Sequence, residues 1–145
     1  MQPKITAAQF QALQAEQMPF ADLFGLSLEE IRTDGVLMRA RYDDRFLRPG
    51  GTISGPVMMA LADAAMYALV LSHIGMVELA VTTNLNINFL RKPSPGDVLA
   101  FAKLLKLGKR LAVGDVVLYS EDESPAKPVA HVTSSYSIPP ITHST

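Results

Sequence analysis

The chain has 145 residues, with thirteen basic and fourteen acidic side chains and no cysteine. This length fits one domain, residues 1–145, with a substantial core, and the lack of cysteine excludes disulfides, thiolate metal sites and a cysteine nucleophile. A net charge of −1 offers no long-range field for nucleic acid or an anionic membrane, so neither is an expected partner, and a small molecule is.

The N-terminal part of the chain predicts a short helix. Thr6 and Gln9 have the spacing of a capping box, and the apolar spacing of Phe10 and Leu13 predicts an amphipathic helix over residues 6–17. The first ten residues lack the apolar core of a signal peptide, so a cytoplasmic location is expected.

A hairpin and a loop follow. Residues 26–31 and 36–42 predict two strands joined at Asp34-Gly35, a dipeptide typical of tight hairpins. Residues 43–51 mix charges with turn residues and predict a loop that leads into the next element.

The next element is unusually apolar. Residues 57–71 contain no Gly, no Pro and one charge, Asp63, and predict a long central helix over residues 55–73. The apolar run is shorter than the ~20 residues that cross a bilayer, so we expect a core helix. Taking an ionised carboxylate out of water is costly unless it has a partner or a use. Asp63 is therefore the first candidate for catalysis.

The C-terminal half predicts a series of strands. Residues 79–90 alternate, with Val81, Thr83 and the apolar residues that follow on one face, and Thr82 and three asparagines on the other. Three more strands are expected over residues 98–107, 110–120 and 129–138.

This order of elements predicts an α+β class protein. A helix that is apolar nearly all round must be covered on most sides, and the simplest solution is a curved antiparallel sheet wrapped around it, which is the hotdog fold. The small residues Ala60, Ala64 and Ala68 let another element approach the helix closely, so we expect at least a dimer.

The start of the central helix has two interpretations. Ser54 suits the N-cap and Pro56 suits the first turn, so Ser54-Gly55-Pro56 simply begins a helix in the simpler interpretation. In the functional one, the free Gly55 N–H and the helix dipole polarise a thioester carbonyl.

Asp63 also has two interpretations. It forms a buried salt bridge with Arg48, Arg45 or Arg91, or it acts on the acyl carbon, as a general base for water or as a nucleophile that gives an acyl anhydride. The sequence does not separate base from nucleophile.

Four segments carry a resemblance to a known family. RPGGTISGPVMMALADAAMY, VTTNLNINFLRKPSPGD, LLKLGKRLAVGDVVLYSED and VAHVTSSYSIP resemble the PaaI-like branch of the hotdog acyl-CoA thioesterases, over roughly residues 25–139. The resemblance implies hydrolysis of an acyl-CoA thioester at a dimer interface, where the helix acid of one subunit acts near residues of the other. It also implies a homodimer that often pairs into a homotetramer.

The resemblance assigns roles to individual residues. Asp63 matches the catalytic acid, Gly55 the oxyanion N–H, and Thr82 a hydroxyl that helps to hold the water, with Ser54 as a supporting polar group. The chain departs from the family where Ser54-Gly55-Pro56 replaces His-Gly-Gly and where Arg48 replaces an Asn. Arg48 either donates to the thioester carbonyl or neutralises Asp63.

Substrate contacts follow from the same resemblance and from side-chain chemistry. The turn Gly108-Lys109-Arg110 matches a place where relatives contact CoA, and Lys and Arg suit phosphates. Arg91 and Lys92 are a second candidate pair. The side chains expected to bound the acyl slot are Phe46, Met59 and Tyr67.

The predicted function is acyl-CoA thioester hydrolysis without a metal or redox cofactor, because His73, His131 and His143 lack metal-ligand spacing. One alternative is a hotdog module that binds acyl-CoA or a related ligand without turnover, Arg48 having neutralised Asp63. A hydratase or dehydratase is a third, although it would need a histidine at the helix start.

Overall fold

The computed structural model describes residues 2–140. Its helices and strands, in chain order, are α1 (Ala7–Gln17), α2 (Pro19–Leu23), β1 (Leu26–Ile31), β2 (Val36–Ala40), the 3-10 turn η1 (Asp44–Phe46), β3 (Leu47–Arg48), β4 (Thr52–Ile53), α3 (Gly55–Ile74), β5 (Val81–Phe89), β6 (Val98–Leu107), β7 (Leu111–Ser120) and β8 (Ala130–Ser137).

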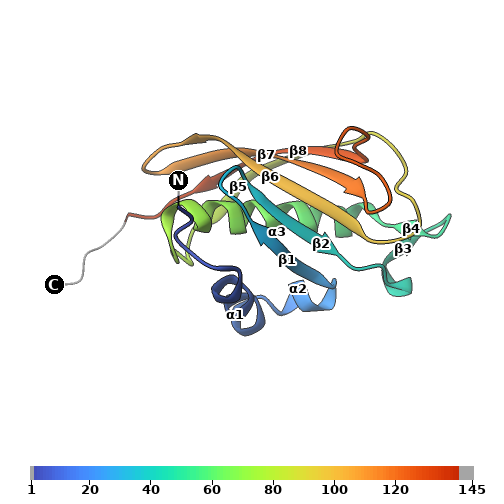
Figure 1. The fold of residues 1–145 in the computed structure, drawn as a ribbon, viewed down its shortest axis with the longest axis horizontal. Helices are drawn as coiled ribbons and strands as arrows, with labels where there is room; N and C mark the ends of the chain where they lie inside the picture. Colours follow the sequence, from blue (N-terminus) through green and yellow to red (C-terminus); the bar gives the residue numbers. More distant parts are fainter. Residues whose placement is uncertain (1, 141–145) are drawn as a thin grey trace.

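The main sheet has six antiparallel strands in the order β1-β2-β6-β7-β8-β5, and it curves around α3 (Figure 1). The short β3 and β4 form a separate two-stranded ribbon beside the start of α3. This architecture confirms the predicted α+β hotdog fold. It also makes β5 an edge strand of the sheet.

The helix α3 is the centre of the core. By length and composition it is long and apolar enough to cross a membrane, but 67% of its apolar window is buried inside this domain. Leu61, Met66 and Leu69 are almost completely buried on it. The helix ends at Gly75, whose φ of 92° favours glycine and whose N–H bonds to the Leu71 carbonyl.

Two N-terminal helices pack against β1 and cover part of the side of α3 that the sheet leaves open. The capping box of α1 is confirmed, because the Thr6 hydroxyl accepts from the Gln9 N–H and the Gln9 side chain accepts from the Thr6 N–H. The sequence prediction missed α2, which begins at Pro19, where the missing N–H is harmless. Phe10 of α1 packs edge-on against Tyr67 of α3.

Between residues 36 and 53 the structure departs from the prediction in two places. Strand β2 ends at Ala40, because the Tyr42 N–H leaves the ladder and bonds to the Asp97 carboxylate at 2.7 Å. Residues 43–51 are not wholly a loop, since Leu47 and Arg48 pair with Ile53 and Thr52 across the β3–β4 ribbon.

Candidate active site

The Asp63 carboxylate is half-buried on α3 and is held by two hydroxyl groups. Thr82 Oγ1 donates to Asp63 Oδ1 at 2.7 Å, and the Tyr136 hydroxyl donates to the same oxygen at 2.9 Å. Both donors bind the carboxylate directly, so Asp63 has the external partners that its position on the helix requires.

Within one chain, the salt-bridge interpretation of Asp63 finds no support. Within residues 2–140 Asp63 has no ion pair; Arg45 pairs with Asp43 at 2.8 Å, and Arg91 Nε donates to the Pro128 carbonyl at 3.1 Å. Arg48 is exposed and lies at a different cavity. The acid is therefore held by neutral hydroxyls and stays available for chemistry.

A β-bulge turns Thr82 toward α3. The register of β5 against β8 pairs Thr82 with Tyr136 and then Asn84 with Ser135, so Thr83 is the extra residue. Thr82 therefore shares the inner face with Leu85, and the prediction that placed Thr82 on the asparagine face is wrong. The bulge thus brings the Thr82 hydroxyl to Asp63, and its expected role in holding the water stays a prediction.

Tyr136 is the site residue that the sequence analysis missed. It is 3% exposed on β8, and burial, reinforced by the nearby Asp63 carboxylate, holds its pKa well above the ordinary value. The phenol therefore keeps its proton and acts as a donor. The available signal was the alternation in β8, which places Val132, Ser134 and Tyr136 on one buried face. A hydroxyl group that is buried on such a face needs a hydrogen-bond partner.

Asp63 opens into a cavity of about 250 Å³ between α3, β5, β8 and the N-terminal helices. Its walls combine the polar Gln17 and the acidic Glu78 with the ring of Tyr67 and with apolar side chains, which include Leu13, Met18, Phe20, Ala64 and Ala80. Of the three side chains predicted to bound an acyl slot, only Tyr67 lines this cavity. Met59 is 42% exposed, and Phe46 packs edge-on against Phe24, so neither belongs to it.

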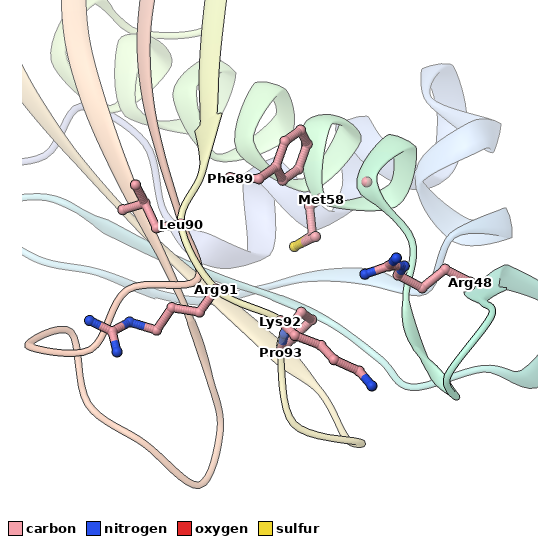
Figure 2. Close-up of a pocket in the computed structure, with 8 residues that line it drawn as sticks. Arg48, Met58, Phe89, Leu90, Arg91, Lys92 and Pro93 are labelled. Atoms are coloured by element: carbon pink, nitrogen blue, oxygen red, sulfur yellow. The ribbon is translucent and has the colours of Figure 1, made fainter.

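Gly55 lines a second cavity, of about 360 Å³, at the first turn of α3. Its walls include the cations Arg48, Arg91 and Lys92 together with Phe89, and none of its described lining residues is acidic. Figure 2 shows Arg48 reaching toward the first turn of α3, whereas Arg91 extends away from it. Added to the positive end of the helix dipole, these cations make the cavity suitable for an anionic or strongly polarised group.

Ser54 occupies the predicted N-cap position, but its hydroxyl makes no capping hydrogen bond. Its backbone is extended, with φ −74° and ψ 158°, as an N-cap residue requires. Ser54 therefore starts the helix through its backbone geometry, and its side chain is not occupied by the capping role.

The turn Gly108-Lys109-Arg110 lies near the opposite end of α3. It lines a third cavity, of about 610 Å³, together with His73, and Arg110 Nε is bonded to the Ile138 carbonyl at 2.9 Å. Within one chain, the turn lines neither the cavity of Gly55 nor that of Asp63.

Within residues 2–140, no three His, Cys, Asp or Glu side chains lie close enough together to hold a metal ion. His131 pairs with Asp115 at 3.1 Å, and His73 lines the third cavity. His143 lies outside the described residues.

The chain was compared with known proteins. The thioesterase superfamily model matches residues 50–127. The crystal structure of a presumed thioesterase from Silicibacter sp. TM1040 is 46% identical, over 97% of this chain and 96% of that one, with a TM-score of 0.85. A mutant structure of the phenylacetic acid degradation protein PaaI from Thermus thermophilus is 25% identical, over 82% and 97% of the two chains, with a TM-score of 0.69.

A presumed esterase from Saccharolobus solfataricus is 25% identical over 118 residues, which are 81% of this chain and 77% of that protein. The family match spans the end of the β3–β4 ribbon, all of α3 and the strands β5 to β7, and so includes Gly55, Asp63 and Thr82. The chain belongs to the thioesterase superfamily, in its PaaI-like hotdog branch, whose chemistry is thioester hydrolysis.

Proposed function

We propose that this protein hydrolyses an acyl-CoA thioester to the free acid and CoA, with Asp63 as the catalytic acid residue and the Gly55 N–H as the carbonyl donor. One observation carries the proposal: within residues 2–140, Asp63 opens into a cavity, has one carboxylate oxygen held by two hydroxyls and forms no ion pair.

Two routes use this carboxylate. As a general base, Asp63 takes a proton from water while the water oxygen attacks the carbonyl carbon; the tetrahedral intermediate then expels the CoA thiolate, which takes up a proton. As a nucleophile, Asp63 attacks the carbon and expels the thiolate, and water then hydrolyses the acyl anhydride. In both routes a donor to the developing oxyanion is worth about 10²- to 10³-fold in rate.

The two parts of the site are proposed to meet in a homodimer. Gly55 and Asp63 are eight residues apart on α3, or about 12 Å along the helix axis, and they line different cavities. A reacting carbon must lie within roughly 3.5 Å of its attacking atom, which is an Asp63 oxygen or the water that Asp63 activates. Because Gly55 and Asp63 of one chain line different cavities, we propose that Asp63 of one copy and Gly55 of another act on the same thioester.

The edge strand β5 is the proposed dimer contact. It is unpaired on one side, and its residues Val81 and Phe89 are 57% and 51% exposed. An open edge with apolar side chains favours pairing with a second copy. A homotetramer built as a dimer of dimers, and a cytoplasmic location, stay predictions.

For the CoA end of the substrate, we favour the cavity of Gly55. Arg91 and Lys92 line it and suit the CoA phosphates, which the pantetheine arm would link to the carbonyl at Gly55. Arg48, which stands where relatives have an Asn, lines the same cavity and is proposed to donate to the carbonyl or to a phosphate. Lys109 and Arg110 would contact the same CoA only from another copy of the chain. The acyl group then occupies the cavity of Asp63, beside Tyr67.

The contacts within one chain give the two alternatives less support. The binding-module hypothesis needs Arg48 to neutralise Asp63, whereas within one chain two hydroxyls hold one oxygen of that carboxylate and Arg48 lines another cavity. A hydratase would need a histidine at the start of α3, where the chain has Ser54.

The test is a panel of acyl-CoA thioesters with detection of the released thiol, for the native chain and for Asp63→Asn. The proposal predicts turnover that falls by at least about 10²-fold in Asp63→Asn, which keeps the size of the side chain but is neither base nor nucleophile. Tight binding of acyl-CoA without release of thiol would support the binding module instead.

A further inference from the structure

We infer that Tyr136 is a positioning residue for Asp63: together with Thr82 it holds Oδ1, so that Oδ2 is the oxygen that acts on the bound thioester or on its water. The inference rests on the proposed function, in which Asp63 is the catalytic acid residue. It adds a residue that the family resemblance did not assign, and it identifies the reacting atom.

The two hydroxyls reach the carboxylate from neighbouring strands. Thr82 of β5 and Tyr136 of β8 are direct cross-strand partners, so their side chains stand on the same face of the sheet, toward α3. Their hydrogen bonds to Asp63 Oδ1 are 2.7 Å and 2.9 Å long. Two donors on one oxygen fix the rotation of the carboxylate about its last side-chain bond, which neither donor does alone.

The other oxygen of the carboxylate is left open. Within residues 2–140, Oδ2 accepts no hydrogen bond. In the same residues, the side-chain atoms that lack a partner and are also sealed from solvent belong to Gln14, Thr52 and Asp115, so Oδ2 is not one of them. Oδ2 is therefore accessible from the cavity that Asp63 lines. A base or a nucleophile needs such an unoccupied lone pair.

The surroundings of Tyr136 keep it in the donor role. Its ring stacks on Tyr67 with 6.0 Å between the centroids and 25° between the planes, and the Tyr67 hydroxyl is itself bonded to the Glu78 carbonyl at 2.8 Å. The Tyr136 hydroxyl also lies 3.2 Å from the Asp63 carbonyl oxygen. A phenol that is 3% exposed gains nothing from solvent, so its proton is directed to Asp63.

Packing alone does not require this hydroxyl. A phenylalanine would fill the same space against Tyr67 without a buried polar group that needs a partner. The chain instead places a hydroxyl where it meets a carboxylate and holds one of its oxygens.

The first experiment compares Tyr136→Phe with Tyr119→Phe. Tyr119 is a half-buried residue of β7 that lines neither the Gly55 nor the Asp63 cavity, so it is a matched control for loss of a phenol. In Tyr136→Phe we expect kcat for CoA release to fall on the order of tenfold and KM to change by less than about twofold. The acidic limb of the kcat profile should move to higher pH in Tyr136→Phe and stay in place in Tyr119→Phe.

Variants of Thr82 test the shared oxygen. Thr82→Val should move kcat and the acidic limb in the same direction as Tyr136→Phe, and Thr82→Ser, which keeps a hydroxyl, should recover most of what Thr82→Val loses. The parallel shift distinguishes positioning of the acid from a general loss of structure, which would not move the pH profile.

A readout without turnover completes the test. Carbon-13 NMR resolves the carboxyl signals, and the Asp63 signal is the one missing in Asp63→Asn; in Tyr136→Phe the chemical shift of this signal should change, because the carboxylate loses a donor. If the native chain releases CoA while Tyr136→Phe keeps its kcat, its pH profile and its Asp63 chemical shift, the inference is overturned and the proposed function survives. If the native chain releases no CoA, the proposed function fails, and an unchanged Asp63 chemical shift in Tyr136→Phe would overturn the hydrogen bond as well.

Discussion

Gly55 and Asp63 belong to the same helix and line two different cavities. Gly55 begins α3 among the cations Arg48, Arg91 and Lys92, whereas Asp63 lies about two turns further along, in a cavity with Thr82 and Tyr136. In the proposed function each copy of the chain supplies a carbonyl-polarising half and an acidic half.

The Gly55 N–H can be removed without breaking the helix. Proline is acceptable at the first helical position, and the extended backbone of Ser54 suits a residue before proline. We expect Gly55→Pro to lower kcat by about 10²- to 10³-fold, because the oxyanion donor is lost.

Gly55→Ala is the control for the added bulk. Its Cβ would lie 3.2 Å from the Phe89 ring, a close contact with a side chain that is 51% exposed and able to shift. The alanine variant keeps the N–H and should keep most of the activity. Equal losses in the two variants would mean that crowding against Phe89, and not the amide, explains the effect.

The basic residues of the Gly55 cavity should act on substrate affinity. We expect Arg91→Gln and Lys92→Gln to raise KM for an acyl-CoA, to leave kcat nearly unchanged, and to weaken the dependence of KM on salt. Hydrolysis of a short thioester without phosphates should not respond. Lys127→Gln, in the exposed loop before β8, is the control for loss of a positive charge. If KM is unchanged in both variants, Lys109 and Arg110 become the favoured CoA contacts.

The pH dependence of stability should include a contribution from His73. Burial, reinforced by the positive charge of Lys4, lowers the pKa of His73 below 6.5, its ordinary value. Between the two values the unfolded chain binds a proton that the folded chain refuses, so stability is lost as the pH falls below about 6.5. The histidine therefore destabilises the fold only in acid.

Thermal unfolding of the native chain and of His73→Gln checks this sign. The Tm of the native chain relative to His73→Gln should decrease between about pH 8 and about pH 5, while contributions from other groups cancel in the difference. If the Tm of the native chain relative to His73→Gln stays constant or rises as the pH falls, the assigned direction of the pKa shift is contradicted.

Much of the fold could be predicted because its signals are local. The fifteen-residue apolar run at 57–71 requires cover on most sides, and the strand patterns around it supply a sheet. The helix α2 was missed because Pro19 was interpreted as a break, although proline is equally suited to a first helical turn. Whether Pro19 interrupts or begins a helix depends on the packing of α2 against β1, and no local sequence pattern encodes that packing.

The site was predictable in part. A lone carboxylate in an apolar helix identified Asp63, and the family resemblance added Thr82. The orientation of Thr82 depends on the bulge at Thr83, which exists only through pairing with β8, so strict alternation placed it on the wrong face. Tyr136 is 73 residues from Asp63 in the sequence, and only the closure of the sheet brings the two together.

The most direct test of the central claim, that two copies of the chain share one active site, is complementation between two inactive variants. Asp63→Asn and Gly55→Pro each remove one half of every site in a pure dimer, but a mixed dimer has one site with both halves intact. After co-expression or mixing under conditions that exchange subunits, we predict that CoA release rises to about one quarter of the native rate, because half of the dimers regain one of their two sites. If the mixture is no more active than either variant alone although subunits exchange, Asp63 and Gly55 do not act across two copies, and the account is contradicted.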